Sequence, residues 1–106
     1  MNDEKMLCLG SKCIEMEYPI RKKIEFSSQI VVLIYDKAII ANNVISYDKQ
    51  GNELWRINDI LNLKRPTGNV DIKKDDESTL DVYSALGILF RIDIEKKQLI
   101  EKQFLK

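Results

Sequence analysis

A pattern that occurs twice constrains this chain most. Residues 44–48 and 53–55, joined by a polar turn, are echoed by residues 89–93 and 98–100, again joined by a polar turn. The offset is 45 residues at both ends of the pattern (93 − 48 and 99 − 54). Each copy has the pattern of a strand, a tight turn and a second strand. A hairpin repeat near this period is typical of a β-propeller blade.

The length of the chain limits how many blades it can hold. Propellers close with four or more blades, and 106 residues hold only about two blades of roughly 40–50 residues each. We therefore predict an all-β fold, an open arc of about two propeller blades, with antiparallel strands, a leading hairpin and at most one short helix. We expect one domain, residues 1–106, with blade units over about 20–57 and 69–106.

In the first half, the pattern predicts a hairpin over residues 5–9 and 12–18, which Pro19 ends because proline cannot donate to a strand ladder. Residues 21–23 are expected to form a solvated connection. The continuous apolar run 30–35 predicts an inner strand covered on both faces. Residues 43–48 predict the next strand, with Gly51 in the following turn.

In the second half, residues 57–68 suit a loop with one helical turn, in which Asn58 or Asp59 caps a short helix through Leu63. Strands are predicted over 69–73, 79–84, 88–93 and 98–104, with turns at 75–78, 85–87 and 95–97. The last segment also suits an amphipathic helix through Ile100 and Phe104.

Charge and hydropathy favour a cytoplasmic protein. Lys plus Arg and Asp plus Glu are both 17, so no overall field attracts nucleic acid or an anionic membrane. The run 30–35 is far shorter than the roughly 18 apolar residues of a membrane-spanning helix. The charged residues 1–5 do not suit a signal peptide. We expect neither nucleic acid nor membrane as a partner.

Cys8 and Cys13 face each other in the predicted hairpin. The register places them at a non-hydrogen-bonded pair, where side chains are closest, so a disulfide is sterically possible. Because disulfides are rare in the cytosol, two reduced thiols are the preferred interpretation. Two cysteines without histidine also fall short of a zinc site.

The residue types argue against catalysis. The chain has no histidine, which removes the usual serine, cysteine and metal hydrolase arrangements. Its four glycines do not form a phosphate-binding loop. We therefore predict no enzyme, no cofactor and no metal. An enzyme that uses Asp and Cys remains a third hypothesis and would need a pocket.

Two features suit contacts with other surfaces. Trp55 is expected to dock one blade on the next, and the alternative is an exposed interface anchor. The densest acidic cluster contains Asp75, Asp76, Glu77 and Asp81. It could meet a basic protein partner, although solvation of an ordinary turn is the simpler explanation.

Residues 46–55, Ser-Tyr-Asp-Lys-Gln-Gly-Asn-Glu-Leu-Trp, resemble a stretch of quinoprotein-like propeller blades, with one residue fewer between Asp and Gly. Two blades lack the cofactor seat of such proteins. The whole layout resembles small bacterial half-propeller proteins, including immunity proteins of contact-dependent growth-inhibition systems. The resemblance is carried by the leading hairpin with its Tyr-Pro-Ile step, the run 30–35, the Asn-Val…Asp…Gly…Leu-Trp segment and the terminal blade.

This resemblance implies a monomeric immunity protein that binds and neutralises a cognate toxin domain, such as a nuclease. The alternative is an assembly module in which copies complete a ring through their edge strands. The acidic residues 75–77 and 81 are the predicted binding residues, and the loop 58–68 is the next surface to consider.

Overall fold

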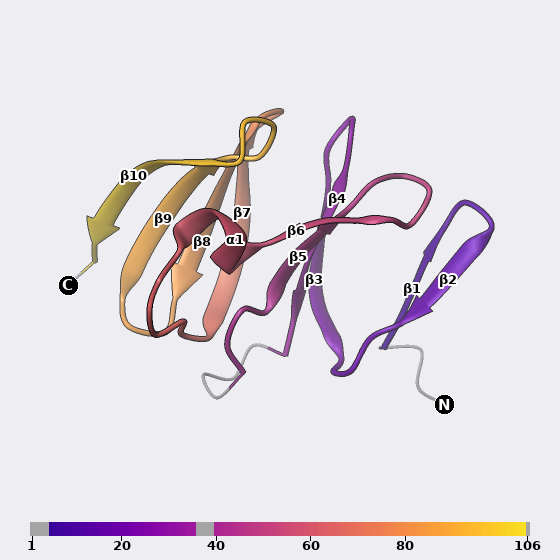
Figure 1. Cartoon of the computed structure of the whole chain (residues 1–106), viewed down its shortest axis with the longest axis horizontal. Coiled ribbons are helices and arrows are strands. Elements are labelled where there is room, and N and C mark those ends of the chain that lie inside the picture. Colours follow the sequence, from indigo (N-terminus) through magenta and orange to yellow (C-terminus); the bar gives the residue numbers. More distant parts are fainter. Residues whose placement is uncertain (1–4, 36–39, 106) are drawn as a thin grey trace.

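The protein is a stack of three antiparallel β layers (Figure 1). The computed structural model describes residues 5–35 and 40–105. The first layer is a hairpin of β1 (Met6–Leu9) and β2 (Lys12–Glu15). The middle sheet has the order β3 (Ile20–Glu25), β4 (Ile30–Ile34), β5 (Val44–Tyr47), β6 (Glu53–Arg56). The third has the order β10 (Gln98–Phe104), β9 (Ile88–Asp93), β8 (Thr79–Ser84), β7 (Asn69–Asp76).

The predicted all-β class with antiparallel sheets and one short helix is confirmed. Each four-stranded sheet follows the chain order from strand to strand and remains open. The two copies of the repeated pattern form the third and fourth strands of the two sheets, which are β5–β6 and β9–β10. Strand β10 confirms the strand interpretation of residues 98–104 over the helical one. Among the described residues, no helix is long and apolar enough to span a membrane.

Three local predictions are wrong. Residues 21–23 belong to strand β3, an edge strand of the middle sheet, and Lys22 contacts Asp71 and the carbonyl oxygen of Ile72 on β7. Strand β7 continues through Asp76, so the β7–β8 turn contains only residues 77 and 78. Helix α1 spans Ile57–Leu61 and has Arg56, not Asn58 or Asp59, as its N-cap residue. The charged residues 1–4 lie outside the described part of the chain.

The hairpin has the predicted register, and its thiol state does not follow the prediction. Leu9 pairs with Lys12 and Cys8 with Cys13, and Gly10 has a positive φ of 61°. Cys8 and Cys13 form a disulfide across the non-hydrogen-bonded pair. The prediction of two reduced thiols is therefore wrong, because it relied on a cytosolic location while the strand geometry itself brings the side chains together.

The middle sheet is covered on both faces, as the unbroken apolar run of β4 predicts. All five residues of β4 are buried. One face packs on the hairpin through a cluster that includes Leu7, Val32 and Ile45. The opposite face packs on the third layer. Strand β4 alternates between the two clusters, because successive side chains point to opposite faces of a strand.

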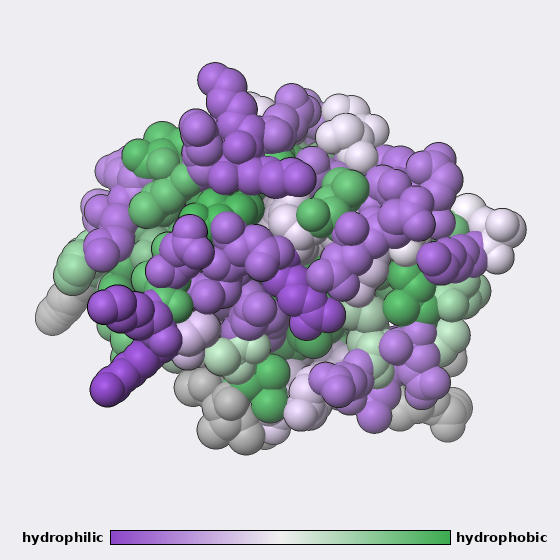
Figure 2. Space-filling view, in the orientation of Figure 1, coloured by the Kyte–Doolittle hydropathy of each residue, from purple (hydrophilic) through white to green (hydrophobic). Residues whose placement is uncertain are grey.

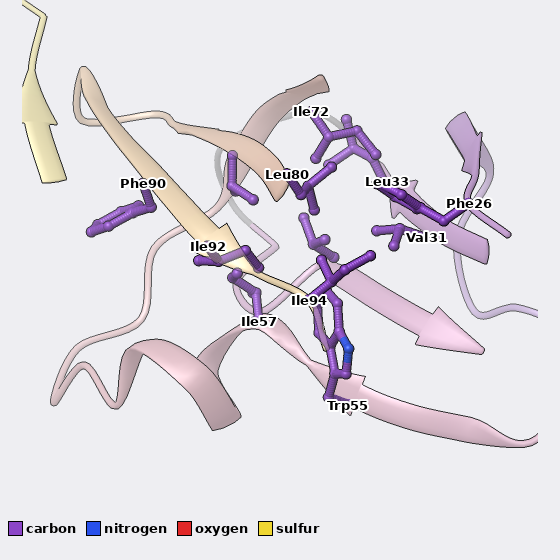
Figure 3. Packing of buried hydrophobic residues seen from close by; sticks show 12 residues of the cluster. Phe26, Val31, Leu33, Trp55, Ile57, Ile72, Leu80, Phe90, Ile92 and Ile94 are labelled. Atoms are coloured by element: carbon purple, nitrogen blue, oxygen red, sulfur yellow. The ribbon is translucent and has the colours of Figure 1, made fainter. Parts of the chain in front are cut away.

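Trp55 lies in the cluster between the two four-stranded sheets (Figure 3). Its side chain is 2% exposed, and its indole Nε1 donates to Oε1 of Gln29 over 3.1 Å. The cluster joins Leu33 of β4 and residues of the third layer such as Leu80 and Ile92. Figure 3 shows these side chains converging between the ribbons of the two sheets. The prediction that Trp55 docks one unit on the other is confirmed.

Asn43 closes one end of the same interface. Its buried Nδ2 donates to the carbonyl oxygens of Ile34, Tyr35 and Asn69 over 2.9–3.0 Å. Its Oδ1 accepts from the backbone N–H of Asn69 over 2.9 Å. One side chain therefore joins the end of β4 to the start of β7, which fixes the position of one sheet relative to the other at this end.

Trp55→Ala is expected to lower the free energy of unfolding by about 3–5 kcal/mol, because it leaves a cavity where the two sheets meet. Trp55 is the only tryptophan in the chain, so native fluorescence reports it directly. Its emission should be blue-shifted and move to the red on urea unfolding. Red-shifted native emission together with unchanged stability of the variant would contradict this packing.

Removal of the disulfide by Cys8→Ser with Cys13→Ser is expected to lower the free energy of unfolding by about 2 kcal/mol, the chain-entropy value for so short a loop. Urea unfolding of both proteins measures the difference. The wild type under reducing conditions should match the double variant, and equal stability of oxidised and reduced wild type would refute the expectation.

Candidate protein-binding surface

The four acidic residues predicted to bind a partner fall into two groups in the structure. Asp81 lies on β8, is 2% exposed and forms an ion pair with Arg91 on β9 over 2.8 Å. Arg91 also contacts Asp75 over 2.9 Å and Glu101 on β10 over 3.1 Å. These four residues form the Arg91 cluster, in which three carboxylates surround one guanidinium.

The charges of the Arg91 cluster are coupled. Partial burial, a hydrogen bond with Asp81 and the charge of Asp81 together raise the pKa of Asp75, and Arg91 offsets part of this rise. The hydrogen bond with Asp81 is the main cause of a raised pKa at Arg91. With all groups ionised, the cluster carries two negative charges more than positive ones. Asp75 and Glu101 are its more accessible carboxylates.

Asp76 and Glu77 form the second group, at the β7–β8 turn, and act within the fold. Oδ1 of Asp76 accepts from the backbone N–H of Ser78 over 2.9 Å. Oε1 of Glu77 accepts from both the N–H and the hydroxyl of Ser27 over 3.0 Å. Oε2 of Glu77 accepts from Lys74 over 2.6 Å. Because Ser27 belongs to the β3–β4 turn, Glu77 ties the third layer to the middle sheet.

The four acidic residues do not form one exposed cluster, because Asp81 is buried and paired with Arg91; their role in binding stays a prediction. Cross-strand pairing decides this, since Asp81 stands directly opposite Arg91 in the β8–β9 register. Charge reversal at residues 75–77 would also break the Arg91 cluster and the contact with Ser27. It would not test surface charge alone.

The exposed apolar side chains gather instead around β10, the last strand of the third layer. Ile100 is 53% exposed and Phe104 is 68% exposed. Leu86, in the β8–β9 turn, is also 68% exposed, and the backbone N–H of Leu105 donates to Gly87 beside it. We call the following set the β10 patch: Leu86, Leu99, Ile100, Phe104 and Leu105. In Figure 2, hydrophobic surface gathers at the left of the molecule, where Figure 1 places β9 and β10.

Strand β10 carries different chemistry on its two sides. It pairs only with β9, so its other edge is free within the described chain. Phe104 stands opposite Ile88 and Lys102 opposite Phe90, so both lie on the side that faces the core. Glu101 stands opposite Arg91 on the outer side. The bulge at Ile100 shifts the alternation between Leu99 and Glu101. The strand thus carries Phe104 and Lys102 on one side and Glu101 on the other.

The loop over residues 58–68, the second predicted surface, is largely committed to packing. Ile60, Leu61 and Leu63 pack against the core between the sheets. Asn58 Oδ1 accepts from the N–H of Leu63 over 2.9 Å, which holds the loop after α1. Helix α1 also contacts β10. This loop therefore supports the β10 patch from the core side.

Sequence reasoning missed the β10 patch, although a signal was present. Ile100 and Phe104 stand out in the segment as large apolar residues among Glu101, Lys102 and Gln103. Their spacing of four favoured a helix whose apolar face is buried. In a strand with a free edge, the same residues are exposed.

No group of described residues could hold a metal ion.

A family model described as Domain of unknown function (DUF7957) matches residues 1–104. The chain belongs to this family. The DUF7957 match includes the hairpin and both sheets, up to the end of β10. No curated protein and no solved structure matches the chain.

The contact of Glu77 with Ser27 and Lys74 gives a test by pH. Hydrogen bonds from Lys74 and then Ser27 lower the pKa of Glu77 from 4.5 to about 2. A lowered pKa means that the carboxylate stabilises the fold above pH 4.5 and loses this effect as the pH falls towards 2. Glu77→Gln should therefore be less stable than the wild type at neutral pH, and the difference should shrink with acidification over this range.

Urea unfolding at a series of pH values measures this difference. Glu95→Gln removes the same charge at an exposed turn and serves as the control. A stability difference for Glu77→Gln that stays constant between pH 5 and pH 2 would contradict the assignment.

Proposed function

We propose that this DUF7957 protein works by protein binding and that the β10 edge is its binding surface. The observation that carries the proposal is the concentration of exposed apolar side chains on and beside β10, a strand with one free edge in the described chain. Exposed apolar surface of this kind can mark interaction sites in soluble proteins. A free strand edge also offers main-chain groups to a partner.

The proposed partner is a cognate toxin domain, such as a nuclease, which the chain neutralises as an immunity protein. Support comes from the resemblance in layout to such proteins and from the charge beside the β10 edge. Nuclease domains that bind a phosphate backbone need positive charge. Asp75 and Glu101 of the Arg91 cluster offer negative charge on the outer side of the sheet, next to the apolar patch.

We also propose that the two four-stranded sheets correspond to two propeller blades and the hairpin to part of a third. Each sheet follows the chain order as a blade does. The first strands of the two sheets also lie close to each other, as inner blade strands would. Lys22 of β3 contacts Asp71 of β7 over 2.9 Å, and Lys74 of β7 contacts the carbonyl of Glu25.

The compartment is a separate question. The cytoplasmic location stays a prediction. The disulfide weighs against it, because such bonds persist mainly in oxidising compartments. A toxin that is met outside the cytoplasm would agree with both the disulfide and the immunity proposal.

Ile100→Lys with Phe104→Lys tests the surface. The double variant is expected to weaken binding of the proposed cognate toxin domain by about thirtyfold or more, as the loss of an interface hot spot does. Protection of cells that express the toxin should fall in parallel. Calorimetric titration measures the affinity. Both residues are more than half exposed, so the fold should survive.

Leu54→Lys is the matched control, because Leu54 is an exposed apolar residue on β6, the edge strand of the other sheet. It should bind as the wild type does. Equal affinity of the double variant and the wild type would remove β10 from the interface. Sedimentation separates the alternative function: a stable ring of identical copies, lost in the double variant, would indicate an assembly module.

A further inference from the structure

A second open strand edge lies at the other end of the molecule, beside a cleft. The hairpin covers only part of the middle sheet and leaves a cleft of about 530 Å³ between β2 and strands β5 and β6. This volume is within the range of ligand sites. The floor is apolar and consists of Ile14, Met16, Ile34, Ile45 and Tyr47.

The backbone of β2 presents unused hydrogen-bonding groups at this cleft. The N–H of Met16 donates to the carbonyl of Lys5, so Met16 belongs to a hydrogen-bonded pair of the hairpin. Pairs alternate along an antiparallel ladder. The N–H and C=O of Ile14 therefore point towards β1, and those of Cys13 and Glu15 point away from it. Within the described residues, Cys13 and Glu15 have no backbone hydrogen-bond partner on that side.

The side chains at this edge specify what could lie beside it. The side chains of Ile14 and Met16 pack against the cluster between the hairpin and the middle sheet. A strand paired with β2 would therefore direct the side chains opposite Ile14 and Met16 towards the middle sheet, and these positions suit apolar residues. Glu15 is exposed on the opposite side of β2. Residues directly opposite in a ladder share a face, so the position facing Glu15 suits Lys or Arg.

The charges of the rim agree with a basic segment. Glu53 is paired with Arg56 over 3.1 Å. Glu15 and Glu17 also line the cleft, and the charge of Glu17 also acts on Arg56. Among the lining residues without an ion pair, Lys12 is the one that carries a positive charge.

We propose that the β2 edge and its cleft bind an extended segment of a protein partner, about five residues long, in which apolar residues alternate with Lys or Arg. The segment would add a third strand to the hairpin and lie in the cleft beside β5 and β6. Such strand addition draws affinity from main-chain hydrogen bonds and specificity from alternate side chains. The disulfide joins β1 to β2 on the solvent side of the hairpin and holds β2 in its extended conformation. The proposal does not depend on the β10 edge or on the toxin partner.

The probe is a capped peptide, acetyl-Thr-Val-Lys-Val-Lys-Val-Thr-amide, titrated into the ¹⁵N-labelled protein. Saturable changes in amide chemical shift are expected at Cys13 and Glu15 and in β5, at peptide concentrations up to about 1 mM, the weak end of specific recognition. The absence of saturable shifts at these positions, or shifts confined to β10, would overturn the proposal.

A pair of variants isolates the main-chain contact. Glu15→Pro removes the N–H that points away from β1 and leaves the hydrogen bonds to β1 intact. Glu15→Gln removes the same charge and keeps the N–H. The Pro variant should bind the peptide about tenfold more weakly than the Gln variant, the loss expected for a main-chain hydrogen bond. Equal affinity of the two variants would overturn strand addition.

A modified peptide gives the same information on the unaltered protein. N-methylation of the residues whose N–H would face β2 should weaken binding about tenfold, and N-methylation of the alternate residues should weaken it much less. Equal losses for the two peptides would also overturn the proposal. This result holds even where the Pro variant fails to fold.

Discussion

The contact between the two four-stranded sheets holds the rest of the structure in place. Its centre is the apolar cluster around Trp55. Within it, Oε1 of Gln29 accepts from both the Trp55 indole and the Ser46 hydroxyl. Asn43 closes one end with hydrogen bonds to both sheets. Burial of a polar group is costly unless it is hydrogen-bonded. Among the described residues, no buried side-chain nitrogen or oxygen lacks a partner, so these amides fix how the sheets meet.

This contact decides which surfaces remain available. The middle sheet is covered by the third layer on one face and partly by the hairpin on the other, so within the described chain it is accessible at the cleft beside β2. Among the surfaces of the described chain that remain accessible are the outer face of the third layer and the edges of β2 and β10. Both edges combine unpaired backbone with apolar side chains nearby. An exposed strand edge of this kind promotes aggregation unless charged residues or irregularities prevent pairing with another chain. Here the charged residues Glu101 and Lys102 on β10 and Glu15 on β2 interrupt the apolar pattern.

The two edges differ in what they would recognise. The β10 edge carries protruding side chains such as Phe104, which would insert into a partner, and its charged side carries the Arg91 cluster. The β2 edge borders a cleft with a recessed floor at Ile45 and Tyr47, which would receive side chains from a partner. A protein that binds with both edges could hold two segments of one partner or two partners at once, because the edges lie in layers at opposite ends of the stack (Figure 1).

The sequence by itself determined most of the strands, though not β3, because alternation, tight turns and the run 30–34 are local signals. It also determined the hairpin register that faces Cys8 with Cys13, since a two-residue turn with Gly10 defines the pairing. Tertiary structure decided what local patterns leave open. Cross-strand pairing buried Asp81 against Arg91 and divided the acidic residues into two groups. The spacing of Ile100 and Phe104 suited a helix, and pairing with β9 made them exposed residues of an edge strand. Exposure depends on which elements pack together, and residues far apart in the chain set that packing.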